Sequence, residues 1–217
     1  MPVQLALDLP TRPAMGREDF LVADCNRLAV DWIDLWPDWP YPLTVLYGPQ
    51  GCGKTHLSRV WQERSGALWA EDQAEKALLD AAGQGRSLCL DINGRVADEA
   101  VLFHLFNWAR EHGASLLLTA RSPARDWSLA LPDLRSRLMA APAVALSQPD
   151  DALLAAVTVK LFADRQLAVS PELLNYVLSR TDRSFAAIGD AVERLDRAAL
   201  RERRRITPRF AKQVLGL

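Results

Sequence analysis

The sequence predicts an α/β fold with a parallel sheet, followed by a small all-helical domain. Short apolar strands alternate with helices up to about residue 148, without the polar alternation of a half-exposed sheet. Four helical segments then follow one another without a strand. A glycine-rich loop lies between the first strand and the next helix, which is typical of phosphate-binding α/β proteins. We expect an N-terminal tail at 1–17, a nucleotide-binding α/β domain at 18–148 and a helical domain at 149–217.

The α/β part contains five predicted strands. A first helix begins at Asn26 and stops before the PDWPYP segment, whose prolines cannot continue it. The predicted strands are 43–47, 67–70, 87–92, 115–120 and 143–147. The predicted helices between them are 54–64, 72–83 and 98–112, and the last two are closed by Gly83 and Gly113.

The remainder of the chain is predicted to be helical at 150–165, 171–180, 184–203 and 208–215. Ser170–Pro171 and Thr207–Pro208 are N-cap residues followed by a first-turn proline. The RERRR segment at 201–205 is interpreted as the solvated end of a helix, with a nucleic-acid contact as the alternative.

Composition narrows the function classes. The chain has 217 residues, 49% of them hydrophobic, and a net charge of −1. No apolar run reaches the roughly 18 residues that a membrane span needs, so we expect no membrane partner. The charge gives no reason to expect a polyanion binder. Three widely spaced cysteines and three histidines without metal-ligand spacing indicate free thiols and a reducing cytoplasm.

A phosphate-binding loop is the most specific motif. GPQGCGKT matches G-x-x-x-x-G-K-[ST] and stands directly after a strand and before a helix. Its residues are Gly48, Pro49, Gln50, Gly51, Cys52, Gly53, Lys54 and Thr55. The glycines allow a tight turn that exposes backbone amides to phosphate. Lys54 would reach the β- and γ-phosphates, and the Thr55 hydroxyl would ligate Mg²⁺.

The carboxylate partner of this loop is predicted to be Asp91, which ends the strand at 87–92. A hydrolytic site of this type usually has a second acid next to it, but Ile92 and Asn93 follow here. We therefore expect ATP or ADP binding with Mg²⁺, and we doubt that the chain hydrolyses ATP by itself.

The motifs together resemble an AAA+ module of the DnaA clade, from the GPxGxGKTH loop that ends in His56 to the helical lid. The resemblance implies the strand order 5-1-4-3-2. FLVADCNRLA at 20–29 is similar to the motif F-x-x-G-x-x-N-R that lies against adenine, with Ala23 in place of glycine. It implies a base-side pocket formed by Phe20, Leu21, Val22 and Asn26.

Three further segments carry the resemblance. LLLTARSP at 116–123 is similar to the sensor I strand, which makes Thr119 the candidate polar residue. LPDLRSRL at 131–138 is similar to box VII and implies an arginine finger at Arg137, with a surface ion pair as the alternative. DRSFAAIGDAVERL at 182–195 resembles the sensor II helix and implies that Arg183 reaches the phosphates.

The N-terminal QLALDLP raises a separate question, because alternating leucines can form a first strand or an extended docking peptide. A DnaA-type module that stops before a DNA-reading domain resembles the Hda-type inactivators, which begin with a QLxLxL clamp-binding peptide. The matching residues are Gln4, Leu5, Leu7 and Leu9. The resemblance implies the DNA polymerase III sliding clamp (β subunit) and DnaA as partners, and it allows a homo-oligomer.

An Hda-type protein would stimulate hydrolysis of DnaA-bound ATP to give inactive DnaA-ADP, with no specific DNA contact of its own. Two alternatives remain open. One is a stand-alone AAA+ ATPase or helicase-loader-like remodeller, with Asn93 or Thr119 near the attacking water. The other is a DnaA-like DNA-binding module, which the net charge of −1 disfavours.

Overall fold

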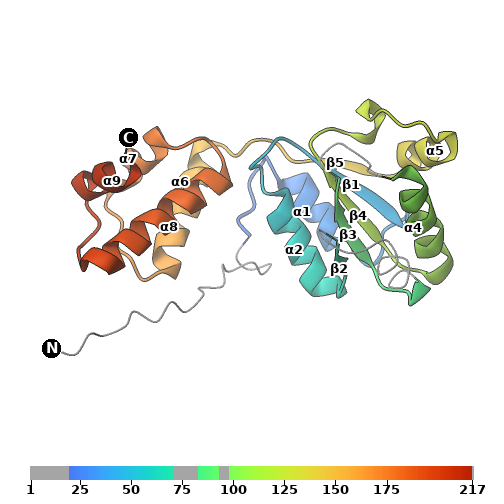
Figure 1. Cartoon of the computed structure of the whole chain (residues 1–217), viewed down its shortest axis with the longest axis horizontal. Coiled ribbons are helices and arrows are strands. Elements are labelled where there is room, and N and C mark those ends of the chain that lie inside the picture. The colour runs from blue at the N-terminus through green and yellow to red at the C-terminus, as the bar shows by residue number, and fades with distance from the viewer. Residues whose placement is uncertain (1–19, 71–82, 93–97, 217) are drawn as a thin grey trace.

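The computed structural model describes residues 20–70, 83–92 and 98–216. It contains an α/β region and a helical region, which lie side by side along the long axis (Figure 1). Residues 72–82 of the predicted helix 72–83 and the N-terminal docking peptide lie outside the described residues. Among the described residues, no helix combines the length and the apolar character that crossing a membrane requires.

The α/β region is built on a five-stranded parallel sheet. Its strands are β1 (Leu43–Tyr47), β2 (Leu68–Trp69), β3 (Leu88–Asp91), β4 (Leu116–Ala120) and β5 (Ala143–Ala145). They are arranged in the order β2-β3-β4-β1-β5, which confirms the predicted order read from the other edge. Each strand except β1 is shorter than predicted, and β5 is an edge strand with two exposed alanines.

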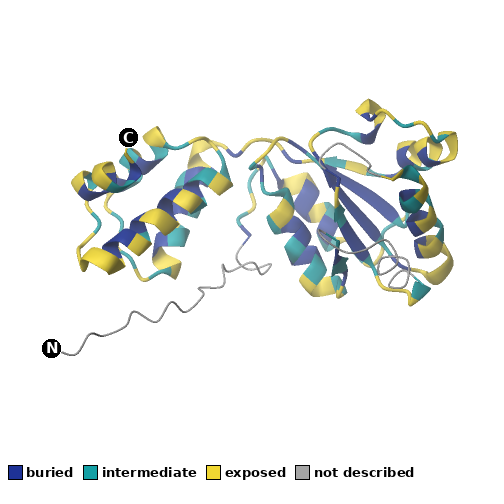
Figure 2. Ribbon diagram, viewed as in Figure 1, coloured by how far each residue is buried: buried dark blue, intermediate teal, exposed yellow. Residues whose placement is uncertain are grey.

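Helices cover both faces of this sheet, as the apolar strands require. The helices are α1 (Arg27–Asp34), α2 (Lys54–Ser65), α4 (Glu99–His112) and α5 (Pro132–Ala140), with a short 3₁₀ turn at Ala124–Asp126 that the sequence did not predict. Leu117 packs with α1 and α2, whereas Leu116 and Leu118 pack with α4 and α5. Alternate residues of β4 therefore supply the two cores. Figure 2 shows the central strands buried between the helices.

The helical region has its own core. It consists of α6 (Asp151–Asp164), α7 (Pro171–Arg180), α8 (Phe185–Glu202) and α9 (Pro208–Leu215). Each helix begins at a residue whose side-chain oxygen accepts a backbone N–H of the first turn, and these caps are Asp150, Ser170, Ser184 and Thr207. Phe162 and Phe210 are buried at the centre of this core.

Candidate nucleotide-binding site

The phosphate-binding loop connects β1 to α2. Gly51 and Gly53 adopt left-handed backbone angles, with φ of 77° and 101°. Gly53 is the N-cap of α2, so the loop turns around the start of that helix. The first N–H groups of a helix lack intrahelical acceptors and carry partial positive charge, which favours an anion at this end. The local chain geometry therefore fits a phosphate-binding role.

Lys54 folds back onto the loop. Its ammonium group donates hydrogen bonds to the carbonyl oxygens of Gly48 at 2.7 Å and Pro49 at 2.8 Å. These acceptors hold the cation at the loop while its side chain stays partly buried. If a phosphate bound here, its charged oxygens would replace the two carbonyl oxygens as acceptors of the Lys54 ammonium group. A charged oxygen is a stronger hydrogen-bond acceptor than a neutral carbonyl.

Cys52 is buried in the loop, with 2% of its surface exposed. Burial raises the pKa of the Cys52 thiol, and this effect exceeds the opposing influence of Lys54. The thiol is therefore neutral near pH 7, and the loop carries no thiolate charge that would repel a phosphate. Pro49 and Gln50 are exposed at the tip of the loop.

Asp91 and Thr119 lie next to one another at the end of the sheet that carries the loop. Thr119 on β4 is in register with Asp91 on β3 and with Leu46 on β1. The backbone N–H of Ile92 donates to the carbonyl of Thr119 at 2.9 Å. Asp91 is exposed, whereas Thr119 is 2% exposed. The parallel sheet thus places a carboxylate and a hydroxyl beside the loop, and Thr55 is exposed on the first turn of α2.

The start of α8 contacts the phosphate-binding loop directly. The N–H of Phe185 donates to the carbonyl of Gly51 at 3.1 Å. A Cβ atom on Gly51 would lie 2.3 Å from the Cβ of Ser184, and one on Gly53 would lie 3.3 Å from the Phe185 ring. Gly51 is therefore needed for this close approach as well as for the turn, whereas a Cβ on Gly53 would require only a small shift of the Phe185 ring. Sequence reasoning did not select Ser184 or Phe185, although the N-cap serine before an apolar helix was visible.

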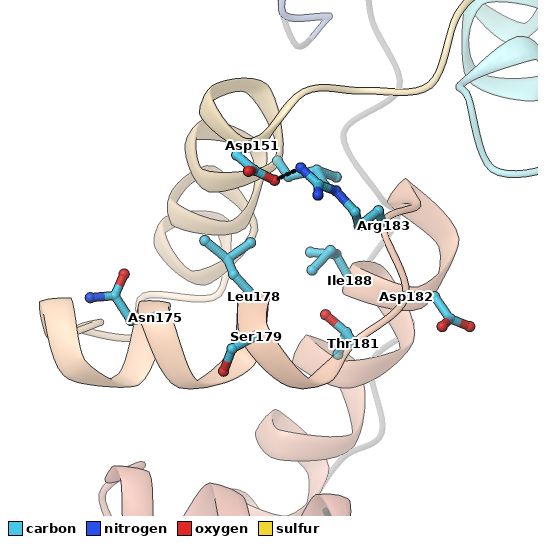
Figure 3. Close-up of a pocket in the computed structure, with 9 residues that line it drawn as sticks. Asp151, Asn175, Leu178, Ser179, Thr181, Asp182, Arg183 and Ile188 are labelled. Atoms are coloured by element: carbon cyan, nitrogen blue, oxygen red, sulfur yellow. Dashed lines mark hydrogen bonds and ion pairs between the residues drawn. The ribbon is translucent and has the colours of Figure 1, made fainter.

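Arg183 immediately precedes this contact and pairs with Asp151 at the start of α6. The pair lies at a cavity of about 610 Å³ in the helical region, whose apolar lining includes Leu154, Leu178 and Ile188 (Figure 3). The Arg183 side chain is 65% exposed. In this structure its guanidinium contacts a carboxylate, and its phosphate role stays a prediction.

The predicted base-side segment is held by Asn26. Its side-chain oxygen accepts the N–H of Ala23 at 2.9 Å, and its amide nitrogen donates to the carbonyl of Leu21 at 2.9 Å. Because Asn26 is 2% exposed, it shapes the backbone and offers little surface to a ligand. Val22 is 39% exposed. Its side chain offers apolar surface that a base could contact.

Phe20 connects this segment to the phosphate-binding helix. Its ring meets the His56 ring edge to face, with centroids 5.1 Å apart. Phe20 is 7% exposed and belongs to the core formed with α1 and α2. The structure therefore brings the base-side segment and the loop together through Phe20 and His56.

Arg137 lies elsewhere, on α5. Its guanidinium carbon lies 4.9 Å from the centroid of Phe103 and 4.7 Å from that of Phe106, both on α4. The Glu99 carboxylate fixes the start of α5 by accepting the N–H of Leu131 at 2.6 Å. In Figure 1, α5 and the helical region lie at opposite ends of the molecule. Arg137 is therefore not grouped with Arg183.

No group of three or more potential ligands from histidine, cysteine, aspartate and glutamate occurs within 20–70, 83–92 and 98–216. A Mg²⁺ ion here would depend on phosphate oxygens together with Thr55 and Asp91, which is the usual way this ion binds in phosphate-transfer sites. Gln4, Leu5, Leu7 and Leu9 lie outside the described residues, so their role stays a prediction.

Sequence comparison identifies relatives of this chain. The family described as "Hda, lid domain" matches residues 150–215. A protein of Haemophilus influenzae, described as uncharacterized, is 30% identical over 195 residues, which cover 83% of this chain and 84% of that protein.

Solved structures share the fold. Domain III of the Thermotoga maritima replication initiation protein DnaA superposes with a TM-score of 0.78 and 20% identity, over 96% of this chain and 98% of that one. AMPPCP-bound DnaA from Aquifex aeolicus gives a TM-score of 0.65 and 19% identity, over 89% of this chain and 71% of that one. The A156S mutant of Thermotoga maritima RuvB gives a TM-score of 0.73 and 13% identity, over 95% of this chain and 72% of that one.

A Gly51→Ala substitution tests the contact between the loop and α8. We expect it to lower the free energy of unfolding by at least about 2 kcal/mol, because the new methyl group adds overlap with Ser184 to the strain of a left-handed alanine. The matched control is Gly66→Ala, since Gly66 has φ of 65° but no atom within 4 Å of the added Cβ. It should lose only about 1 kcal/mol in urea unfolding. Equal losses in the two variants would contradict the contact.

Proposed function

Because the chain belongs to the Hda-like family of DnaA-related AAA+ proteins, we propose that it is a nucleotide-bound regulator of bacterial replication initiation. It would bind ADP or ATP and promote hydrolysis of the ATP held by DnaA, which leaves inactive DnaA-ADP. The observation that carries this proposal is the direct contact of Gly51 in the phosphate-binding loop with Phe185 at the start of α8. This contact brings the two regions together where a nucleotide would bridge them.

The residues around the loop fit a nucleotide with its magnesium ion. Loop amides and the start of α2 would bind the phosphates, and Lys54 would exchange its carbonyl partners for phosphate oxygens. Thr55 and Asp91 would hold Mg²⁺, which supplies positive charge that neutralises the phosphates. The Thr119 hydroxyl would face the terminal phosphate. Arg183, which directly precedes the N-cap residue of α8, would leave Asp151 and reach the phosphates.

Hydrolysis by this chain alone is not part of the proposal. Ile92, which follows Asp91, is 9% exposed and belongs to the core that the sheet forms with α4 and α5. An aliphatic side chain cannot orient or deprotonate water. Nucleotide binding would then serve assembly with DnaA, whose own site would perform the chemistry.

Arg137 would supply the arginine finger to the neighbouring DnaA subunit. Two observations support this role. The end of the molecule that carries α5 is opposite the chain's own helical region (Figure 1). The guanidinium is partly buried against the faces of Phe103 and Phe106. Cation–π contacts of this kind orient an arginine at modest energy, so the side chain stays available to a charged partner.

The N-terminal peptide would dock on the sliding clamp. In an extended peptide alternate residues face the same surface, so Leu5, Leu7 and Leu9 could enter apolar pockets together. Gln4 would meet polar groups at the edge. Docking would bring the regulator to clamps loaded on DNA, after replication has begun.

An Arg137→Ala variant should lose the ability to stimulate ATP hydrolysis by DnaA. We expect the stimulated rate to fall by about 10³-fold, or to the unassisted rate of DnaA, because arginine fingers supplied in trans contribute on this scale. Release of phosphate from DnaA-bound ATP in the presence of DNA-loaded clamp measures the effect.

The matched control is Arg135→Ala, which removes an exposed arginine from the same helix. It should keep nearly full stimulation. Arg137→Lys keeps the charge and loses the planar fork, so it should rescue little. If Arg135→Ala were as inactive as Arg137→Ala, a general charge effect of α5 would replace the finger role.

A Gln4→Ala/Leu5→Ala/Leu7→Ala variant should lose clamp binding. The wild-type chain is expected to bind purified clamp in the micromolar range, since ordering a flexible peptide lowers its affinity. Surface plasmon resonance with immobilised clamp should show at least a tenfold weaker response for the variant. An Ala6→Ser/Asp8→Ala variant changes the intervening residues and should bind like wild type. Equal binding by all three proteins would refute the docking peptide.

A further inference from the structure

The lid end of the molecule carries a basic surface that the proposed function does not use. Residues 194–216 contain eight arginines and lysines and two acidic residues. The basic residues are Arg194, Arg197, Arg201, Arg203, Arg204, Arg205, Arg209 and Lys212. They lie on the second half of α8, on α9 and on the connection between them. The last turn of α8 and the start of α9 lie at the end of the helical region away from the sheet (Figure 1).

Four of these basic side chains form what we call the lid tip: Arg203, Arg205, Arg209 and Lys212. All four are exposed, and none has an ion pair or side-chain hydrogen bond with a described residue. The neighbouring Arg201 and Arg204 are partly compensated, since they share the single carboxylate of Glu202 at 3.7 Å and 3.3 Å. The positive charge of the tip is therefore available to a partner.

The backbone at the tip also favours an anion. Thr207 caps α9, and Arg209 stands in the first turn of that helix. A cation in a first turn is disfavoured by the positive end of the helix dipole. An anion bound at the first turn of α9 would be attracted by the Arg209 cation and by the positive end of the helix dipole. Arg209 and Lys212 are three residues apart on α9 and share one face, opposite the buried Phe210.

The residue types at the lid tip indicate which class of partner it would bind. Three of its four cations are arginines, whose planar guanidinium matches phosphate oxygens in a bidentate arrangement. Leu200, 69% exposed, is the one large apolar side chain exposed among the described residues 194–216, and a single leucine does not make the apolar centre of a protein interface. Phe210 is 1% exposed, so the surface offers no aromatic ring on which the bases of a single strand could stack. Phosphates displayed by a duplex fit these properties.

We propose that the lid tip binds the phosphate backbone of duplex DNA without reading its sequence. This inference goes beyond the proposed function and does not require DnaA or the clamp. With about four phosphate contacts, the affinity would lie near 10⁻⁵ M at physiological salt and would fall steeply as salt rises. The net charge of −1 does not oppose this, because the positive charge is concentrated at one end.

The test measures fluorescence anisotropy of a labelled 30-base-pair duplex of arbitrary sequence with the full chain, between 50 and 200 mM salt. We compare wild type with Arg205→Glu/Arg209→Glu and with the neutral Arg205→Gln/Arg209→Gln. The charge-matched control is Arg110→Glu/Arg125→Glu, which changes two exposed arginines of the α/β region. Circular dichroism verifies that each variant is folded.

We expect wild type to bind and the glutamine variant to bind more weakly by tens of fold at about 0.1 M salt, with a salt slope smaller by about two. The glutamate variant should bind more weakly still, and the control should lose much less affinity. The inference would be overturned if wild type did not bind DNA at 50 mM salt, or if the tip and control variants lost equal DNA affinity. An unchanged salt slope in the glutamine variant would also overturn it. So would binding of the chain to phosphatidylserine vesicles without binding to DNA.

Discussion

The hydrogen bond from the Phe185 N–H to the Gly51 carbonyl, 3.1 Å long, is the contact on which the proposed site depends. It joins the start of α8 to the loop before α2, two elements that lie 134 positions apart in the chain. The absence of a Cβ on Gly51 permits this approach, because that atom would overlap Ser184. The contact places the phosphate-binding loop against a residue that is two positions from Arg183.

The parallel sheet supplies the other half of the arrangement. Because β3, β4 and β1 run in the same direction, Asp91, Thr119 and the loop reach the same edge. The buried Asn26 amide then fixes the backbone of the base-side segment, and the Phe20 ring holds that segment against His56 of α2. The same scaffold places Arg137 on α5, away from this edge. One chain could thus hold a nucleotide and also present an arginine to a neighbour.

The sequence predicted most of this architecture, because its signals are local. Apolar runs marked the five strands, N-cap residues marked α7 and α9, and the loop motif marked the glycine-rich turn between β1 and α2. The contacts between distant segments had no local signal. Asp151 as the partner of Arg183 and the phenylalanine rings beneath Arg137 depend on how the helices pack. Asn26 matched a base-side motif, yet its side chain is used to shape the backbone.

Hydrogen exchange with and without ADP tests the central claim most directly, that one nucleotide contacts both the loop and α8. The account predicts slower exchange for amides of residues 51–55 and also of 184–187 when ADP and Mg²⁺ are added. Lys54→Ala should show neither change at the same concentrations. Protection confined to 51–55 would contradict the bridging site, and no protection at either segment would contradict nucleotide binding itself.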